Sequence, residues 1–163
     1  MAVDIFLNIP KVSGESIDAQ FAGQIDVLSW SWGLSNAGSA GTGTGSGTGK
    51  VNIQDLTLTK YVDKSTPTLM AACCAGTAYD GPVILTMRRA GGTAPQPYLQ
   101  LSLGNVTVSG HTHATSTSDD KQTETVTLHF ATVQMQYTPQ SADGTSGAAV
   151  TAKWHIPKNT SQF

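Results

Sequence analysis

Charged side chains are scarce in this sequence: Asp, Glu, Lys and Arg make up 12% of the 163 residues, against roughly 25% in a typical globular domain. The formal net charge is −2. The chain therefore has neither the basic surface that nucleic acid requires nor the basic cluster that binds an anionic membrane. We expect no nucleic-acid partner and no membrane insertion. A surface with few charges costs little to dehydrate, which favours packing against another protein.

Cysteines and long apolar segments are also rare. The two cysteines, Cys73 and Cys74, are adjacent, and this spacing strains a disulfide and closes no stabilising loop. The N-terminal residues have neither the basic start nor the apolar stretch of a signal peptide, and no segment is apolar for long enough to span a bilayer. The sequence predicts a protein made in the cytoplasm.

Motifs for nucleotide binding and nucleophilic catalysis are missing. The glycine-rich stretch 37–49 precedes Lys50, but a P-loop needs glycine where Thr44 stands and serine or threonine where Val51 stands. There is no GxSxG motif, and neither cysteine has a histidine nearby in the sequence. The carboxylates, Glu124 among them, are spread over separate segments, which indicates solvated side chains. We predict no enzyme, no catalytic residue and no cofactor.

Two histidines carry the one pattern with metal-ligand chemistry. His111 and His113, with Asp119 and Asp120 downstream, offer donor types that can hold a metal ion. The stretch around them, 109–120, is rich in serine and threonine, a composition typical of a flexible solvated loop. We therefore predict no metal site.

Hydrophobic and polar residues alternate along several segments, as in β-strands with one buried face. Leu28, Trp30, Trp32 and Leu34 alternate with small residues, which predicts a strand whose hydrophobic face packs in the core. Three longer segments change the parity of their hydrophobic positions partway, at Asp55, near Gly104 and near Ala131. Each change indicates a bulge or a bend, and long bent strands let a sheet curl into a barrel.

One helix is expected among the strands. It begins at Ser65 or Thr66, has Pro67 in its first turn and ends at Gly76, which can adopt the left-handed conformation of a helix C-cap. Most of its residues are apolar, so it must dock against the strands or against a neighbouring protein. The chain length suits a single domain, 1–163, with flexible loops at about 37–49 and 109–120.

Several segments closely resemble the Hcp (haemolysin-coregulated protein) family of the type VI secretion system. The most specific are DVLSWSWG and VNIQDLTLTKYVDKSTP, and the similarity runs along the whole chain. The resemblance implies a mainly β fold, a two-sheet β-barrel with one flanking α-helix, as in phage tail-tube proteins. It also implies a structural homo-hexameric ring. Stacked rings form an inner tube that a contracting sheath expels, so that the protein is secreted without a signal peptide.

The resemblance also implies partners and roles for particular residues. The partners are the sheath, baseplate and spike proteins and effector proteins carried in the lumen of the tube. Three groups of residues receive expected roles: the ring lumen is lined by Ser29, Ser31 and Ser35; the loop that reaches the next ring contains Gly41, Thr42, Gly43, Thr44, Gly45 and Ser46; and the helix meets the neighbouring subunit through Leu69, Met70 and Cys73. The alternative is a monomeric β-barrel that binds a small ligand.

Overall fold

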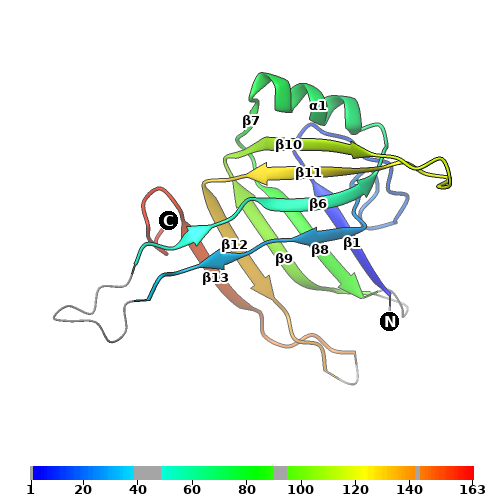
Figure 1. Ribbon diagram of the computed structural model, residues 1–163. Helices are drawn as coiled ribbons and strands as arrows, with labels where there is room; N and C mark the ends of the chain where they lie inside the picture. The colour runs from blue at the N-terminus through cyan, green and yellow to red at the C-terminus, as the bar shows by residue number, and fades with distance from the viewer. Residues whose placement is uncertain (1, 39–48, 90–94, 142–143) are drawn as a thin grey trace.

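Two large antiparallel β-sheets, a small two-stranded sheet and one helix make up the described part of the fold (Figure 1). The computed structural model describes residues 2–38, 49–89, 95–141 and 144–163. The larger sheet has the strand order β13 (Val150–His155), β12 (Thr132–Tyr137), β9 (Pro97–Gly104), β8 (Val83–Arg89), β1 (Val3–Asn8) and β2 (Ile25–Asp26). The second sheet has the order β3 (Ser29–Ser31), β6 (Leu56–Tyr61), β11 (Thr123–His129), β10 (Val106–Ala114) and β7 (Ala78–Tyr79). The remaining elements are β4 (Leu34–Ser35), β5 (Asn52–Ile53), which pairs with it, and helix α1 (Thr66–Ala75).

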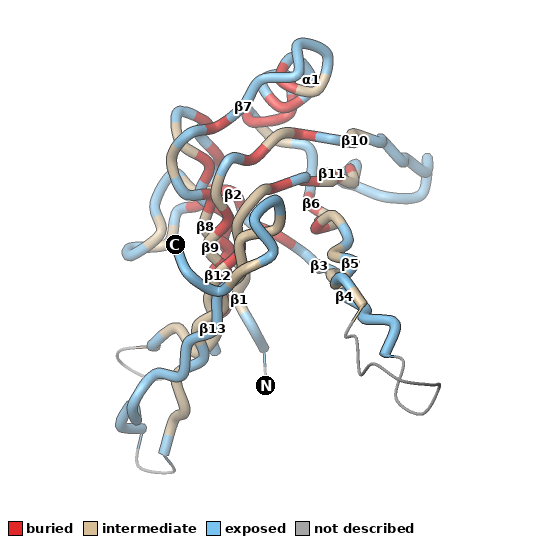
Figure 2. The backbone as a smooth tube through the Cα atoms, turned by 90° about the vertical axis from the view of Figure 1, so that its left-hand side faces the viewer, coloured by how far each residue is buried: buried red, intermediate tan, exposed pale blue. Residues whose placement is uncertain are grey.

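The core lies between the two large sheets, where Figure 2 shows the buried segments gathered. Along β6 and β11 buried and half-buried positions alternate, because successive side chains of a strand point to opposite faces. Removing one such aliphatic side chain from water contributes about 1.5–3 kcal/mol. The side chains that are at most 1% exposed include Leu7, Ile25, Leu56, Leu58, Leu85, Leu101, Leu103 and Leu128.

The changes of hydrophobic parity fall where the chain leaves one sheet for another. β9 ends at Gly104 and β10 starts at Val106 in the second sheet, with Asn105 between them at a φ of 52°. The chain returns across Phe130 and Ala131, from β11 to β12. A strand that changes sheets meets the core from the other side, so its inward positions shift. The predicted bends are confirmed, and the two large sheets of the described residues do not close into one continuous barrel.

Helix α1 begins and ends close to where the sequence predicted. Thr66 is its first residue, and Gly76, at a φ of 63°, closes it by donating its backbone N–H to the carbonyl of Ala72. The Ser65 side chain makes no capping hydrogen bond to the helix and instead donates to Asp63. Leu69 and Ala72 are buried, and the helix packs over β10.

The segment 28–35 is not the single core strand that its alternation predicts. Trp30 and Trp32 do pack against the core, but Leu28 and Leu34 are 45% and 57% exposed. After β3 the chain leaves the second sheet, and β4 and β5 form a separate two-stranded arm. The Trp32 indole N–H donates to the carbonyl of Gln54 at 2.9 Å, which ties the base of this arm together.

The prediction of a flexible loop at 109–120 is wrong for residues 109–114. Residues 109–114 belong to β10 and pair with β11, from His111 opposite Val126 to Ala114 opposite Thr123. Cross-strand pairing satisfies the backbone of this polar segment, which composition alone does not reveal. The connection between the strands is therefore 115–122. In the part of the chain that the structure describes, no helix has the length and hydropathy to cross a membrane.

Candidate functional site

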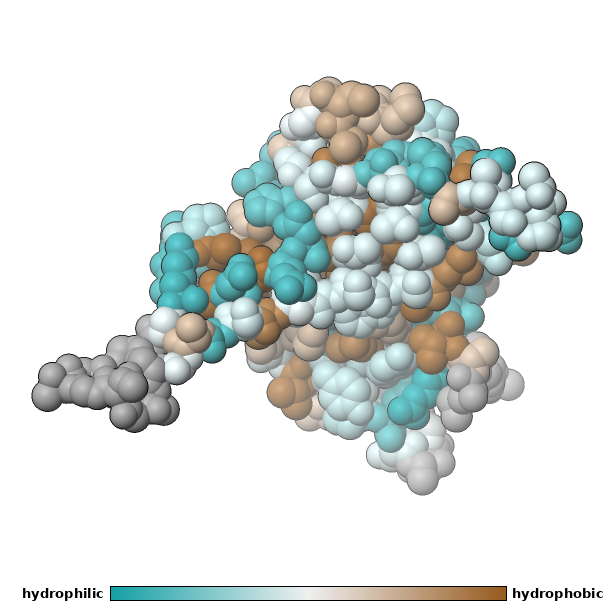
Figure 3. Space-filling model, viewed as in Figure 1, coloured by the Kyte–Doolittle hydropathy of each residue, from teal (hydrophilic) through white to brown (hydrophobic). Residues whose placement is uncertain are grey.

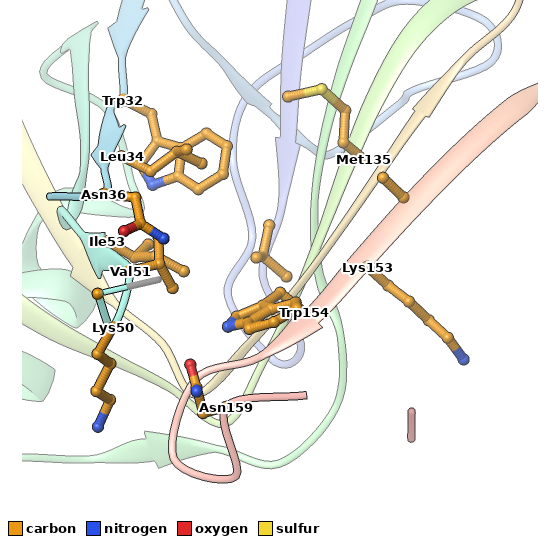
Figure 4. A pocket seen from close by; sticks show the side chains of 13 residues that line it. Trp32, Leu34, Asn36, Lys50, Val51, Ile53, Met135, Lys153, Trp154 and Asn159 are labelled. Carbon is orange, nitrogen blue, oxygen red and sulfur yellow. The ribbon is translucent and has the colours of Figure 1, made fainter. Parts of the chain in front are cut away.

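A groove of about 680 Å³ separates the β4–β5 arm from β12 and β13. Figure 4 shows Trp32 and Leu34 on the arm facing Met135 and Trp154 on the sheet. Lys153 also borders the groove, but its ammonium group points away from the centre. An open apolar concave surface of this kind is typical of a site that another molecule covers.

The outer edge of β13 lies beside this groove, and among the described residues only Thr160 pairs with it, at His155. β13 is the outermost strand of the larger sheet, and Val150 at its start is 67% exposed. Lys153 is the one charged side chain of this strand, so little charge protects the edge from pairing with another chain. Because Ala152, Lys153 and Trp154 belong to both features, a partner that extends the sheet would also approach the groove.

The three serines predicted to line a lumen are exposed. Ser29 and Ser31 lie in β3, at the edge of the second sheet, and Ser35 lies in β4. Trp30, between the first two, faces the core. The serines are thus available to a solvent-filled channel, and their place in a lumen stays a prediction.

The helix residues predicted to meet a neighbour differ in exposure. Leu69 is 0% exposed and packs in the core of its own subunit, so its predicted interface role is wrong. Met70 is 52% exposed, and Cys73 is partly buried against the core. Figure 3 shows a hydrophobic surface over α1 at the top of the molecule. The interface role of Met70 and Cys73 stays a prediction.

The predicted ring-stacking residues lie outside the described residues. They are Gly41, Thr42, Gly43, Thr44, Gly45 and Ser46. Their role stays a prediction.

A polar cluster is buried where β6, β10 and β11 meet the start of α1. Lys60 and Glu124, both 0% exposed at their side chains, form an ion pair. The Lys60 ammonium also lies 3.0 Å from Asp63 Oδ1 and donates to the carbonyl of Tyr61. The prediction that the carboxylates are solvated is therefore wrong for Glu124.

Glu124 accepts hydrogen bonds at both carboxylate oxygens. Oε1 accepts from Lys60 and from the Thr66 hydroxyl at 2.9 Å, whereas Oε2 lies 2.9 Å from His111 Nε2. Burial raises the pKa of Glu124, but the hydrogen bonds from Lys60, His111 and Thr66 together outweigh it, so the pKa lies below its ordinary value. Glu124 is therefore a buried anion at neutral pH.

A second charge cluster surrounds the buried Arg88, and its acidic members are partly exposed. Its guanidinium lies 3.1 Å from Asp18 Oδ1 and 2.9 Å from Asp4 Oδ2, and it also lies over the ring of Phe6. The ring of Phe6 stacks on Phe21 with a centroid separation of 4.4 Å. The hydrogen bond from Arg88 lowers the pKa of Asp18 and, in turn, raises the pKa of Arg88. This cluster fixes the segment that contains Asp18 to β1 and β8.

The sequence contains a signal for the buried ion pair that composition does not show. Lys60 continues the inward positions of Leu56 and Leu58 along β6, and Glu124 occupies the inward position before Val126 in β11. Charged residues at inward positions of two strands indicate a buried pair. The groove has no comparable signal, because its walls come from distant parts of the chain.

A family model described as "Type VI secretion system effector, Hcp" matches residues 6–137. The chain belongs to the Hcp family. Protein hcp1 of Pseudomonas aeruginosa is 53% identical over 160 residues, which cover 98% of each chain. The family predicted from the sequence is thereby confirmed.

Solved structures agree with this assignment to the Hcp family. The crystal structure of Hcp1 from Salmonella typhimurium is 32% identical, with a TM-score of 0.79 and coverage of 98% of both chains. A structure described as that of a type six secretion system protein has a TM-score of 0.90 at 26% identity, and covers 98% of this chain and 99% of its own. The mainly β, two-sheet fold with a flanking helix is the Hcp fold.

Proposed function

We propose that this Hcp protein is a structural subunit that forms homo-hexameric rings, and that the rings stack into the expelled inner tube of a type VI secretion system. The observation that carries the proposal is the exposed edge of β13 beside the apolar groove. An edge strand exposes unpaired backbone groups that another subunit can pair with, and the groove offers hydrophobic surface to the same neighbour. Closure into a ring satisfies both surfaces in every subunit.

Sedimentation velocity on the purified protein tests ring formation. We expect a hexamer, and electron micrographs of the same sample should show rings with an open centre. Leu34→Glu places a charge in the groove and should shift the protein towards the monomer, because burying that charge at an interface is costly. Thr117→Glu, on the exposed 115–122 connection, is the matched control and should leave the hexamer intact.

The alternative, a monomeric β-barrel that binds a small ligand, gains support from the size of the groove. About 680 Å³ falls in the range of ligand pockets, roughly 300–1,000 Å³. A monomer at every concentration, with Leu34→Glu sedimenting like the parent protein, would refute the ring and leave this alternative.

Effectors are proposed to bind in the lumen of the ring. Ser29, Ser31 and Ser35 present small hydroxyl-bearing side chains that leave room for a cargo protein. Ser31→Gln adds bulk at six positions of a hexamer and should lower the amount of effector that co-purifies with the ring. Retention equal to that of the parent protein would refute the lumen role, while the ring itself is checked separately by sedimentation.

The tube is proposed to assemble in the bacterial cytoplasm, where it contacts the sheath, baseplate and spike proteins, and to leave the cell when the sheath contracts. The low charge of the surface suits extensive protein contacts. Immunoblots of culture medium should detect the protein in cells with an intact sheath and lose it when the sheath gene is deleted. Equal amounts in the two media would contradict this route.

A further inference from the structure

Three potential metal ligands come together on the β10–β11 hairpin. His111 and His113 are two residues apart on β10, so they share one face of the strand. The strand register places Glu124 of β11 directly opposite His113. One ligand atom from each of these residues lies within 4.8 Å of the other two. The site thus results from a local spacing and from one cross-strand pair, on the two adjacent strands at the upper right of Figure 1.

The distances are close to those of a metal centre. His111 Nε2 lies 2.9 Å and His113 Nδ1 lies 3.6 Å from Glu124 Oε2. In a tetrahedral zinc site with bonds of about 2.0–2.1 Å, neighbouring ligand atoms lie about 3.3 Å apart. One nitrogen of each imidazole lies within 4.8 Å of the other, so every pair of ligand atoms is within about 1.5 Å of this spacing.

The burial of His111 and the exposure of His113 are both compatible with a bound metal ion. The His111 side chain is 4% exposed, and its Nδ1 has no hydrogen-bond partner in the part of the chain that the structure describes. Nδ1 is not one of the proposed ligand atoms; the ring nitrogen directed at the site is Nε2, which faces Glu124 Oε2. The His113 side chain is 51% exposed, which gives an ion a path from solvent and leaves room for a water molecule as a further ligand.

Among the described residues that contact Glu124, Lys60 carries a fixed positive charge that opposes a cation, but its ammonium contacts a different carboxylate oxygen from the histidines. Its ammonium binds Glu124 Oε1, whereas both histidines face Oε2. Asp63 also pairs with Lys60, so two carboxylates surround one ammonium and leave one net negative charge. The hydrogen bonds to Oε1 hold the carboxylate in place, as groups behind a metal ligand commonly do.

We propose that His111 Nε2, His113 Nδ1 and Glu124 Oε2 form a binding site for a divalent transition-metal ion, with zinc as the best match. Two imidazoles and one carboxylate favour zinc over Mg²⁺ and Ca²⁺, which take oxygen ligands. This proposal differs from the prediction of no metal because Glu124, the third ligand, lies on the neighbouring strand. The ion would link the outer part of β10 to β11 without taking part in the proposed ring contacts.

Zinc titration of the tag-free, full-length protein tests the proposal. Isothermal titration calorimetry should give one zinc ion per subunit, and MgCl₂ under the same conditions should give no binding. His113→Ala removes the exposed ligand with little risk to folding and should weaken zinc affinity at least about tenfold. Zinc should also raise the melting temperature of the parent protein, since it binds the folded state, and should raise that of His113→Ala less.

Two controls separate this site from other zinc ligands. His129→Ala removes an exposed histidine that lies 2.8 Å from Asp55 and should leave the affinity unchanged. Cys73→Ser/Cys74→Ser removes both thiols and should also bind zinc like the parent protein. No binding to the parent protein, or an affinity that His113→Ala leaves intact, would overturn the proposal.

Discussion

Lys60 and Glu124 face each other on β6 and β11, and the side chains of both are fully shielded from solvent. Such a pair contributes little net stability when it is intact, because removing two charges from water is costly. Replacing only one partner is strongly destabilising, because the other charge then stays buried without its counter-ion. The pair therefore fixes which residues can occupy these two positions.

The first prediction concerns Glu124→Gln, which keeps the shape of the side chain and removes its charge. It should lower the free energy of unfolding by about 3 kcal/mol, near the low end for a broken buried pair, because Asp63 still compensates Lys60 in part. Urea unfolding measures this. Asp120→Asn, at an exposed position, is the matched control and should change stability by less than about 0.5 kcal/mol. A loss equal to that of the control would contradict the assignment.

The same pair allows a second measurement. Lys60→Met/Glu124→Leu replaces both charges by hydrophobic side chains of similar size, and it should recover most of the stability that Glu124→Gln loses. A double variant as unstable as the single one would show that the hydrogen bonds of Glu124 to Thr66 and His111 dominate instead.

The order of elements could be predicted because hydrophobic parity records which side of a strand meets the core. The changes of parity at Gly104 and near Ala131 correspond to the two corners at which the chain changes sheets. Helix α1 was predictable for a local reason, because Pro67 and Gly76 act within one turn of its ends. Such signals are encoded by neighbouring residues.

The sites were less predictable because they depend on contacts between distant segments. Leu34 alternates like a core residue, yet the arm that carries it leaves the sheet and exposes it. His111 and His113 lie in a segment whose composition indicates a loop, and only the pairing with β11 brings them to Glu124. Leu69 and Met70 are adjacent apolar residues, and the docking of α1 decides which one is buried.

The contact between Asp18 and Arg88 should make a pH-dependent contribution to the stability of the fold. The folded-state pKa of Asp18 lies below the ordinary aspartate value of about 3.9. The contact therefore stabilises the fold at pH values above about 4, and this contribution is lost as the pH falls through the folded-state pKa. The melting temperature of Asp18→Asn should be lower than that of the parent protein at pH 7, and the difference should shrink below pH 4.

Asp26→Asn is the control for this pH series. Asp26 is exposed, and the described residues contain no ion pair to it. Its variant should follow the parent protein across the whole pH range. A difference between Asp18→Asn and the parent protein that stayed constant down to pH 2 would contradict the contribution of the Asp18 charge.

Gly14 should not tolerate a side chain. A Cβ atom at this position would lie 2.2 Å from the carbonyl oxygen of Gln24 and 2.6 Å from the Cα atom of Ile25, both backbone atoms. Gly14→Ala must therefore move the backbone, and we expect a loss of about 1–3 kcal/mol, as for overpacked cores. Gly38→Ala, where a Cβ atom would meet nothing within 4 Å, should leave the urea midpoint nearly unchanged. Equal midpoints for the two variants would contradict this packing.

Substitutions at Leu58 and Leu34 should affect different properties, the first the stability of the fold and the second the proposed assembly. Leu58 is 0% exposed between the sheets, so Leu58→Ala leaves a cavity and should lower the free energy of unfolding by about 2–5 kcal/mol. Leu34, 57% exposed in the groove, contributes little to its own subunit, and Leu34→Ala should change this free energy by less than about 0.5 kcal/mol in dilute protein. In concentrated samples Leu34→Ala should have the larger effect on assembly, because it removes contact area from the proposed ring interface and should reduce the share of the proposed hexamer in sedimentation. A hexamer that survives Leu34→Ala with unchanged concentration dependence would show that the groove lies outside the interface.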